Sequence, residues 1–288
     1  MKFPAYWSRA TAQETDADGK PVAFSCWRSS DESADDAHSK ALAVAKRVLK
    51  QLLDGRPPER YAYGQVPMRE EVMQQFTNDR GELIAAVTTN AYGSLVLNTA
   101  GVMFIDIDFP PIGPGEQLRY FFARWFTRTA QSPEARRETD VVHGFERFLR
   151  DHPAWSARLY RTCAGMRVLV THDLFDPADD STRAILETVG ADPMYMRLCR
   201  GQRSFRARLT PKPWRCGHTK NAVRWPYESE TAEQAYEAWR AKYIEAQSSY
   251  ATCRLVQTLG NGAVHPDAQQ VVAVHDKVTR TAEPLALA

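Results

Sequence analysis

The feature that most restricts the fold is an apolar run that contains two carboxylates, VMFIDIDF at residues 102–109. A short apolar run that ends in a segment rich in proline and glycine is typical of a buried β-strand. Because side chains alternate between the faces of a strand, Asp106 and Asp108 share one face and the neighbouring isoleucines share the other. The isoleucine face must pack against other elements. The aspartate face is therefore a candidate functional surface.

The segments that follow residue 102 predict a particular order of elements. We expect strands at 102–109, 158–162, 166–172 and 204–210, a helical region over 116–152 that is broken near Pro133, and a helical stretch over 181–200. This β-α-β-β-α-β order is that of the split βαβ, or ferredoxin-like, arrangement. Such a sheet carries its two helices on one face and leaves the other free for a ligand. The first strand is expected between the third and the fourth.

The predicted fold class is α+β, an RRM- or ferredoxin-like split βαβ core with an N-terminal α/β extension and a helical C-terminal tail. The three regions are residues 1–80, 81–228 and 229–288. In the extension we expect a strand at 22–28, a helix over 31–54 that starts with a capping box of Ser29 and Glu32, and a helix over 67–77. Further strands are expected at 83–89 and 94–99, and helices in the tail at about 229–249 and 266–280.

Composition excludes several classes of protein. The 288 residues include seven Trp, eleven Tyr and twelve Phe, which are enough to build a core and argue against a disordered chain. No apolar run reaches the roughly 18 residues that span a bilayer, so no membrane partner is expected. The N-terminus lacks the apolar stretch of a signal peptide. The five Cys are scattered, which predicts reduced thiols and a cytoplasmic protein.

One segment concentrates positive charge, although the whole chain has a net charge of only +2. Residues 197–224 contain seven Arg and two Lys and no acidic residue. A basic segment inside a nearly neutral chain predicts contact with phosphates. Within it, Trp214 is a candidate for stacking on a base. The candidate phosphate contacts beside this indole in a nucleic acid are Lys212, Arg215 and Lys220.

Arginines on the neighbouring strands are expected on the same face as the aspartates. In SFRARLT, at residues 204–210, the arginines alternate with apolar residues that must face the helices. Two more arginines flank the turn at 163–165. The candidate nucleotide and phosphate ligands are therefore Arg161, Arg167, Arg206 and Arg208. Together with Asp106 and Asp108 as ligands of Mg²⁺ or Mn²⁺, they form the set that nucleotidyl transfer needs. The alternative is that these charges form cross-strand ion pairs.

Two of these motifs resemble the archaeo-eukaryotic primase superfamily. VMFIDIDF is similar to the family's apolar strand that ends in Asp-x-Asp, and RTCAGMRVLVTH at 161–172 is similar to the hairpin that follows it. The resemblance covers about residues 102–210 and implies a modified RRM-like core in which Asp106 and Asp108 hold a divalent metal. Arg167 occupies the position of the hairpin His, which in the family contacts nucleotide phosphates. SFRARLTPKPW lacks the third carboxylate of the family.

Three functions remain open at this point. The first is metal-dependent binding of a nucleoside triphosphate by a primase-like protein, with nucleotidyl transfer on a nucleic acid. The second is a non-catalytic nucleic-acid-binding module on the same fold, which the missing carboxylate favours. The third is a glycosyltransferase that holds a nucleotide sugar through Asp-x-Asp and Mn²⁺.

Two minor motifs are interpreted as structural. The spacing of Cys199, Cys216 and His218 matches no strong zinc pattern, so zinc is not expected. The doublet His275-Asp276 has no further metal ligands near it in the sequence and is interpreted as a pair on the surface of a helix.

Overall fold

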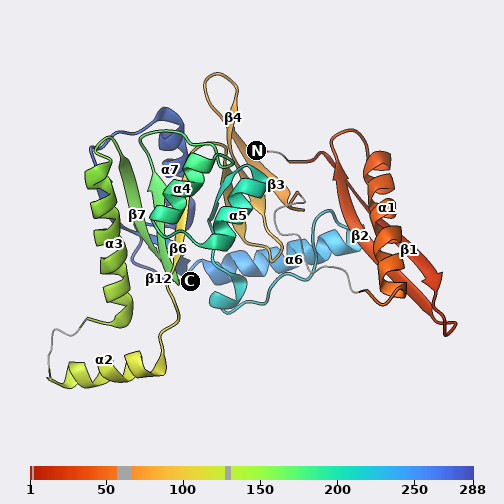
Figure 1. The fold of residues 1–288 in the computed structure, drawn as a ribbon, viewed down its shortest axis with the longest axis horizontal. Helices are drawn as coiled ribbons and strands as arrows, with labels where there is room; N and C mark the ends of the chain where they lie inside the picture. Colours follow the sequence, from red (N-terminus) through yellow and green to blue (C-terminus); the bar gives the residue numbers. More distant parts are fainter. Residues whose placement is uncertain (2, 57–66, 127–130) are drawn as a thin grey trace. The chain divides into compact units, whose positions relative to one another are not determined.

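The computed structural model describes residues 1, 3–56, 67–126 and 131–288. Contacts divide the chain into two compact units, one of residues 2–68 and one of residues 69–288 together with Met1. Both units combine helices with antiparallel strands, so the α+β class is confirmed (Figure 1). The division between the units lies about a dozen residues before the boundary expected at residue 80.

The first unit is a β-hairpin covered by one helix. Strands β1 (Tyr6–Thr15) and β2 (Pro21–Ser30) pair in antiparallel fashion, and α1 (Ala34–Leu53) packs on them. Ala12, Ala45 and Leu49 are buried between the helix and the hairpin. The predicted strand at 22–28 is confirmed, whereas β1 was not expected. The helix begins after Ser33, whose side chain accepts a hydrogen bond from the Asp36 amide, and not after the predicted cap at Ser29.

The second unit contains two four-stranded sheets. The first sheet has the order β3-β4-β5-β9, with bounds Glu71–Thr77, Leu83–Thr89, Leu95–Thr99 and Phe205–Arg208. Every pair of adjacent strands in this sheet is antiparallel. The strands expected at 83–89 and 94–99 are confirmed. The helix expected at 67–77 is wrong, because residues 71–77 form β3 on the edge of this sheet.

The second sheet contains the aspartate strand. Its order is β11-β7-β8-β6, with bounds Cys253–Gly260, Ser156–Thr162, Gly165–Val170 and Phe104–Asp108. Strand β8 lies between β6 and β7 and is antiparallel to both. The last strand of the predicted core, β9, contacts β6 but is hydrogen-bonded to β5 in the other sheet. The expected position of that strand in the ladder beside β6 is therefore wrong, and β11 shows that the C-terminal region is not purely helical.

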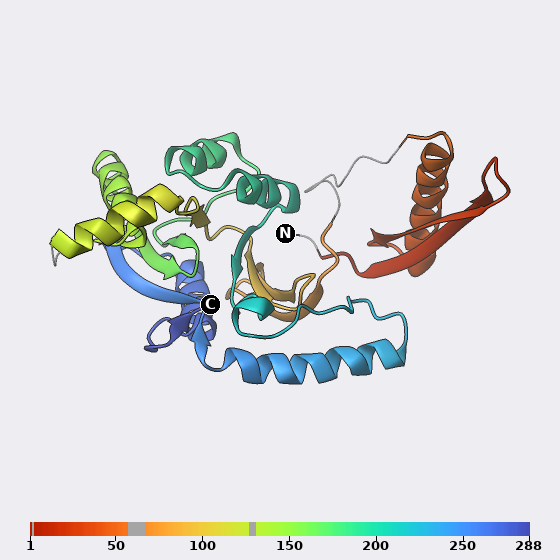
Figure 2. The same ribbon diagram turned by 90° about the horizontal axis from the view of Figure 1, so that it is seen from below.

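Helices cover both faces of the second sheet. The helices of this unit have the bounds Pro114–Phe126 for α2, Pro133–Asp151 for α3, Asp180–Thr188 for α4, Pro193–Gln202 for α5, Glu230–Gln247 for α6 and Pro266–Thr279 for α7. The short elements are η1 (Pro213–Arg215) and the parallel pair β10 (Tyr250–Ala251) and β12 (Ala286–Leu287). Figures 1 and 2 show α4 and α5 on one side of the strands and α7 on the other. The His275 ring of α7 lies 5.4 Å from the Phe104 ring of β6. The face that was expected to be open is therefore covered by α7.

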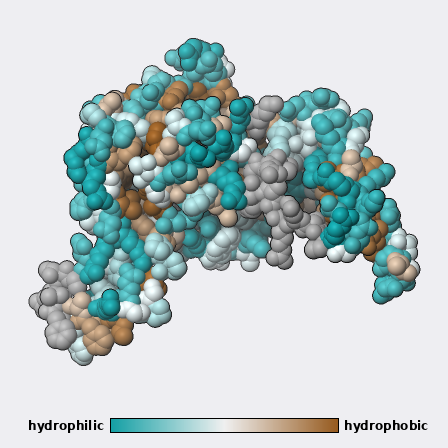
Figure 3. Space-filling model, in the orientation of Figure 1, coloured by the Kyte–Doolittle hydropathy of each residue, from teal (hydrophilic) through white to brown (hydrophobic). Residues whose placement is uncertain are grey.

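Helix α2 presents its apolar side to solvent. Its exposed apolar residues are spaced at i, i+3, i+4 and i+7, as on one face of a helix. They are Leu118, Phe121, Phe122 and Trp125, with exposed fractions of 57%, 65%, 47% and 78%. Figure 3 shows hydrophobic atoms gathered at the place where Figure 1 draws α2. Arg137 of α3 holds the start of the helix through an ion pair of 2.7 Å with Glu116.

Within the described parts of the chain, no helix has both the length and the hydropathy required to cross a membrane.

The packing predicts a large loss of stability for one substitution of a large apolar residue and almost none for another. Leu169→Ala in β8 removes a fully buried side chain and should lower the free energy of unfolding by about 2–5 kcal/mol. Trp125→Ala on α2 removes a mostly exposed side chain and should change this free energy by less than about 0.5 kcal/mol. Urea unfolding followed by circular dichroism measures both values. Similar losses in the two variants would contradict the described packing of α2.

Candidate functional site

The carboxylate of Asp106 forms an ion pair with Arg167 across two neighbouring strands. The two residues lie directly opposite each other in the register of β6 and β8. The Arg167 Nε donates to Asp106 Oδ1 at 2.8 Å, and its Nη2 donates to Oδ2 at 3.2 Å. Arg167 is only 1% exposed. The cross-strand ion pair that the sequence left open as an alternative is therefore present for these two residues.

The third side-chain nitrogen of Arg167 connects this pair to three further elements. Its Nη1 donates to the Arg208 carbonyl of β9 at 2.9 Å and lies 3.4 Å from His275 Nε2 of α7. It also lies 3.5 Å from the Cys253 Sγ of β11. Burial opposes the charge, but the adjacent Asp106 carboxylate keeps the pKa of the Arg167 guanidinium above its usual range. Arg167 is therefore a permanent buried cation that joins both sheets and α7.

His275 continues the network on the far side of Arg167. Its Nδ1 lies 3.0 Å from Asp276 Oδ1, which also accepts a hydrogen bond of 2.8 Å from the Tyr160 hydroxyl. Arg158 donates to Asp276 Oδ2 at 2.6 Å. Burial lowers the pKa of His275 to about 4, so the neutral ring donates through Nδ1 and offers Nε2 to Arg167. His275 is fully buried, and its interpretation as a surface residue is wrong.

This network bears directly on the predicted metal site. Each oxygen of Asp106 accepts a hydrogen bond from the Arg167 guanidinium, so the charge of this carboxylate is balanced within the protein, although its side chain is 32% exposed. Among the described residues, no group of three or more His, Cys, Asp or Glu side chains is arranged to hold a metal ion. The two-aspartate site for Mg²⁺ or Mn²⁺ that the resemblance implies stays a prediction.

Two of the other predicted arginines have structural partners. Arg206 forms two hydrogen bonds, of 2.8 and 2.9 Å, with the buried carboxylate of Glu70 and one of 2.6 Å with Asn98 of β5. Arg161 donates to the Gly165 carbonyl at 2.8 Å, and its guanidinium carbon lies 4.7 Å from the centre of the Phe109 ring. The structure therefore holds Arg206 within the other sheet and Arg161 at the β7–β8 turn, and it brings neither into contact with Asp106.

Three other predicted cations lie close together in the sequence, at the end of β9 and just after it. We call Arg208, Lys212 and Arg215 the basic cluster. Burial lowers the pKa of Lys212, and the positive charges of Arg208 and Arg215 lower it further. Within the described residues none of them forms an ion pair, and the buried Nε of Arg208 has no hydrogen-bond partner there. Lys220 is exposed, and no interaction within these residues joins it to the cluster.

Trp214 lies within the basic cluster and is half exposed, at 52%. The Lys212 Nζ lies 5.7 Å from the centre of its indole ring. The Tyr92 ring meets the indole edge to face, with ring centres 5.2 Å apart. These contacts orient the indole and leave part of its surface open to solvent.

The charges of two members of the basic cluster, Lys212 and Arg208, act on the carboxylate of Asp108. Its backbone is opposite Gly165, where a Cβ atom would lie 2.1 Å from the Ile107 carbonyl, so the close approach of the strands requires glycine there. Partial burial and the carboxylates of Asp106 and Asp192 raise the pKa of Asp108, while Lys212 and Arg208 lower it. The cations thus offset only part of the repulsion among these carboxylates.

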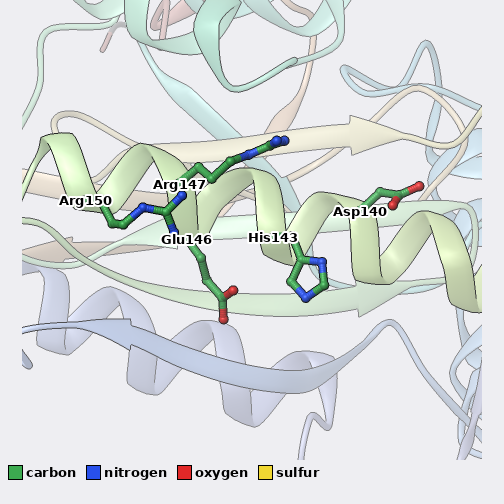
Figure 4. A pocket seen from close by; sticks show the side chains of 5 residues that line it. All are labelled: Asp140, His143, Glu146, Arg147 and Arg150. Atoms are coloured by element: carbon green, nitrogen blue, oxygen red, sulfur yellow. The ribbon is translucent and has the colours of Figure 1, made fainter.

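A separate hollow of about 440 Å³ lies along α3. It is lined by Asp140, His143, Glu146, Arg147 and Arg150. Figure 4 shows these side chains spread along one helix, with Glu146 and Arg147 pointing to different sides of it. They do not converge on a common point, so this hollow is a weaker candidate for a site than the basic cluster.

Searches against protein-family models, curated proteins and solved structures found no match for this chain.

The buried histidine predicts a pH dependence of stability. His275 has a pKa of about 4 in the folded chain and about 6.5 when unfolded, so the unfolded state binds a proton first as the pH falls. Its stabilising contribution is complete above pH 6.5 and should be lost between about pH 6.5 and 4, up to roughly 3 kcal/mol. Urea unfolding across this range measures it. His275→Gln should flatten the curve, and parallel curves for the two proteins would contradict the assignment.

Proposed function

We propose that the chain binds the phosphates of a nucleotide or of a single-stranded nucleic acid at the basic cluster, with a base against Trp214. The observation that carries this proposal is that Lys212 lies 5.7 Å from the centre of a half-exposed indole, and that neither it nor Arg208 or Arg215 forms an ion pair among the described residues. Like charges repel one another, and an anion that binds between them removes that cost. Two of the three are arginines, which bind phosphate oxygens through two parallel hydrogen bonds.

The indole argues for a nucleotide over a simple anion. Lys212 lies near the Trp214 ring, so the same ligand can place phosphate against the ammonium and a base against the indole. Stacking on an aromatic ring contributes about 1–3 kcal/mol per base and tolerates any base. Neighbouring phosphates add an attraction that salt weakens. This combination supports binding with little sequence preference.

The two catalytic hypotheses both require a divalent metal at the aspartate pair. Primase-like nucleotidyl transfer and Asp-x-Asp glycosyl transfer both use the aspartate pair to hold a divalent metal against a nucleotide. In either one, Asp106 would bind the metal while it is paired with Arg167, and the positive charge of this buried guanidinium opposes a second cation. The geometry therefore favours the non-catalytic binding module, on a chain whose motifs resemble the primase superfamily.

Removing one cation of the basic cluster should weaken binding. Lys212→Ala and Arg215→Ala should each reduce the affinity for an oligothymidine of about 15 nucleotides and lower the dependence of log affinity on log salt by about one. Trp214→Ala should weaken binding by about 1–3 kcal/mol at all salt concentrations, because stacking is lost and no charge is removed. Fluorescence anisotropy of the labelled oligonucleotide measures each constant.

Arg119→Ala is the matched control, since it removes one exposed cation from α2 and leaves the basic cluster intact. Its affinity should stay close to that of the wild type. Equal losses in Arg119→Ala and Lys212→Ala would show attraction by net charge alone and would overturn the proposed site.

A further inference from the structure

Helix α2 carries a second candidate binding surface, far in sequence from the basic cluster. We call Leu118, Phe121, Phe122 and Trp125 the apolar face of α2; each is between 47% and 78% exposed. We propose that this face binds the surface of an anionic lipid bilayer, with the helix lying in the plane of the interface. The expectation of no membrane partner concerned runs long enough to span a bilayer. A helix of 13 residues is too short to span but long enough to lie on the surface.

The rest of the protein holds α2 from the side opposite to the apolar face. At about 100° per residue, Glu116 lies about 170° from the centre of that face. Its carboxylate pairs with Arg137 of α3 at 2.7 Å, and Arg137 also donates to the Pro110 carbonyl at 2.5 Å. Tyr120 and Ala123, each about 150° from the same centre, are half-buried. The apolar face is therefore directed away from the protein to which α2 is attached.

Two arginines flank the apolar face symmetrically. Arg119 and Arg124 lie about 110° from its centre, one on each side. Both are exposed, and residues 117–126 contain no acidic residue. Arginines in such positions can reach lipid phosphates while the apolar side chains between them enter the bilayer. The helix is therefore complementary in charge to an anionic surface.

Aromatic rings make up most of the apolar face. The Phe121 ring lies 6.1 Å from the Phe122 ring and 6.3 Å from the Trp125 ring, so the three form a continuous patch. Trp, Phe and Leu on one side and Lys or Arg on the other are typical of helices that lie in a membrane interface. Indole rings in particular concentrate at the level of the lipid headgroups.

The size and charge of the surface argue against a second copy of the chain as its occupant. A stable protein interface uses about 20–30 residues on each side, whereas the apolar face offers four. A symmetric pair would also bring Arg119 and Arg124 of both copies together, with no acidic residue in 117–126 to offset them. A lipid surface sets no such minimum area, because each apolar side chain that enters it adds to binding.

Co-sedimentation of the full chain with vesicles tests the proposal. We expect binding to an equal mixture of phosphatidylcholine and phosphatidylglycerol, and much weaker binding to phosphatidylcholine alone. Phe121→Ser should weaken binding to the anionic vesicles about tenfold, because an aromatic ring no longer leaves water. Arg119→Ala should weaken it about fivefold at low salt and less at high salt, because one attraction to the lipid phosphates is lost.

Matched controls for these two variants lie on α6. Ile244→Ser removes an exposed apolar side chain and Lys242→Ala an exposed cation, and both should bind vesicles as the wild type does. Trp125→Phe provides a second readout, because it keeps a ring on the apolar face. This variant should still bind, but most of the blue shift in tryptophan emission that anionic vesicles produce in the wild type should disappear.

Absence of binding to anionic vesicles would overturn the proposal, as would equal binding to both kinds of vesicle. Equal losses in Phe121→Ser and Ile244→Ser, or in Arg119→Ala and Lys242→Ala, would show attraction that does not involve α2 and would also overturn it. Where vesicles do not bind, size-exclusion chromatography and the oligothymidine assay identify the occupant. A dimer that Phe121→Ser dissociates would assign the face to a second copy, and weaker oligothymidine binding in that variant would assign it to the nucleic acid.

Discussion

The arrangement of the larger unit depends on one buried guanidinium. Arg167 pairs with Asp106 of β6, donates to a carbonyl of β9 and lies against Cys253 of β11 and His275 of α7. A charge without water must have its partners in place, so this side chain restricts how the two sheets and the helix can pack. A set of apolar contacts would tolerate small shifts between these elements. The directed donors of a guanidinium tolerate far less.

The charged residues around the Asp106–Arg167 ion pair fall into two groups. Asp106, Arg167 and the His275-Asp276 doublet satisfy one another inside the protein, while the basic cluster keeps its charges beside an exposed indole. Both groups have carboxylates and cations on neighbouring strands, so the residue types alone do not distinguish them. The difference lies in the partners that each side chain meets. Arg206 is bound by Glu70, whereas the buried Nε of Arg208, two residues further on, has no hydrogen-bond partner among the described residues.

Local patterns predicted most of the elements of this chain and few of the contacts between them. The strands at 83–89 and 102–109 have strong alternation or long apolar runs, and packing leaves little choice for such segments. Strand β3 was mistaken for a helix because EVMQQFT is short and half polar, and only its pairing with β4 fixes its conformation. The buried network could not be predicted, because His275 lies 108 positions after Arg167 and local sequence carries no signal for that contact. The adjacency of Lys212, Trp214 and Arg215 could be predicted, because these residues lie within four positions of one another.

The span of that network along the chain has a consequence during synthesis. Asp106 and Arg167 leave the ribosome well before His275, which at about 5–20 residues per second is an interval of roughly 5–20 s. Until α7 forms, Phe104 and Tyr160 lack the imidazole that packs against them in the complete chain. During this interval Arg167 lacks one of its contacts, and the core between β6, β7 and α7 is incomplete. Assembly of this unit therefore waits for the synthesis of α7.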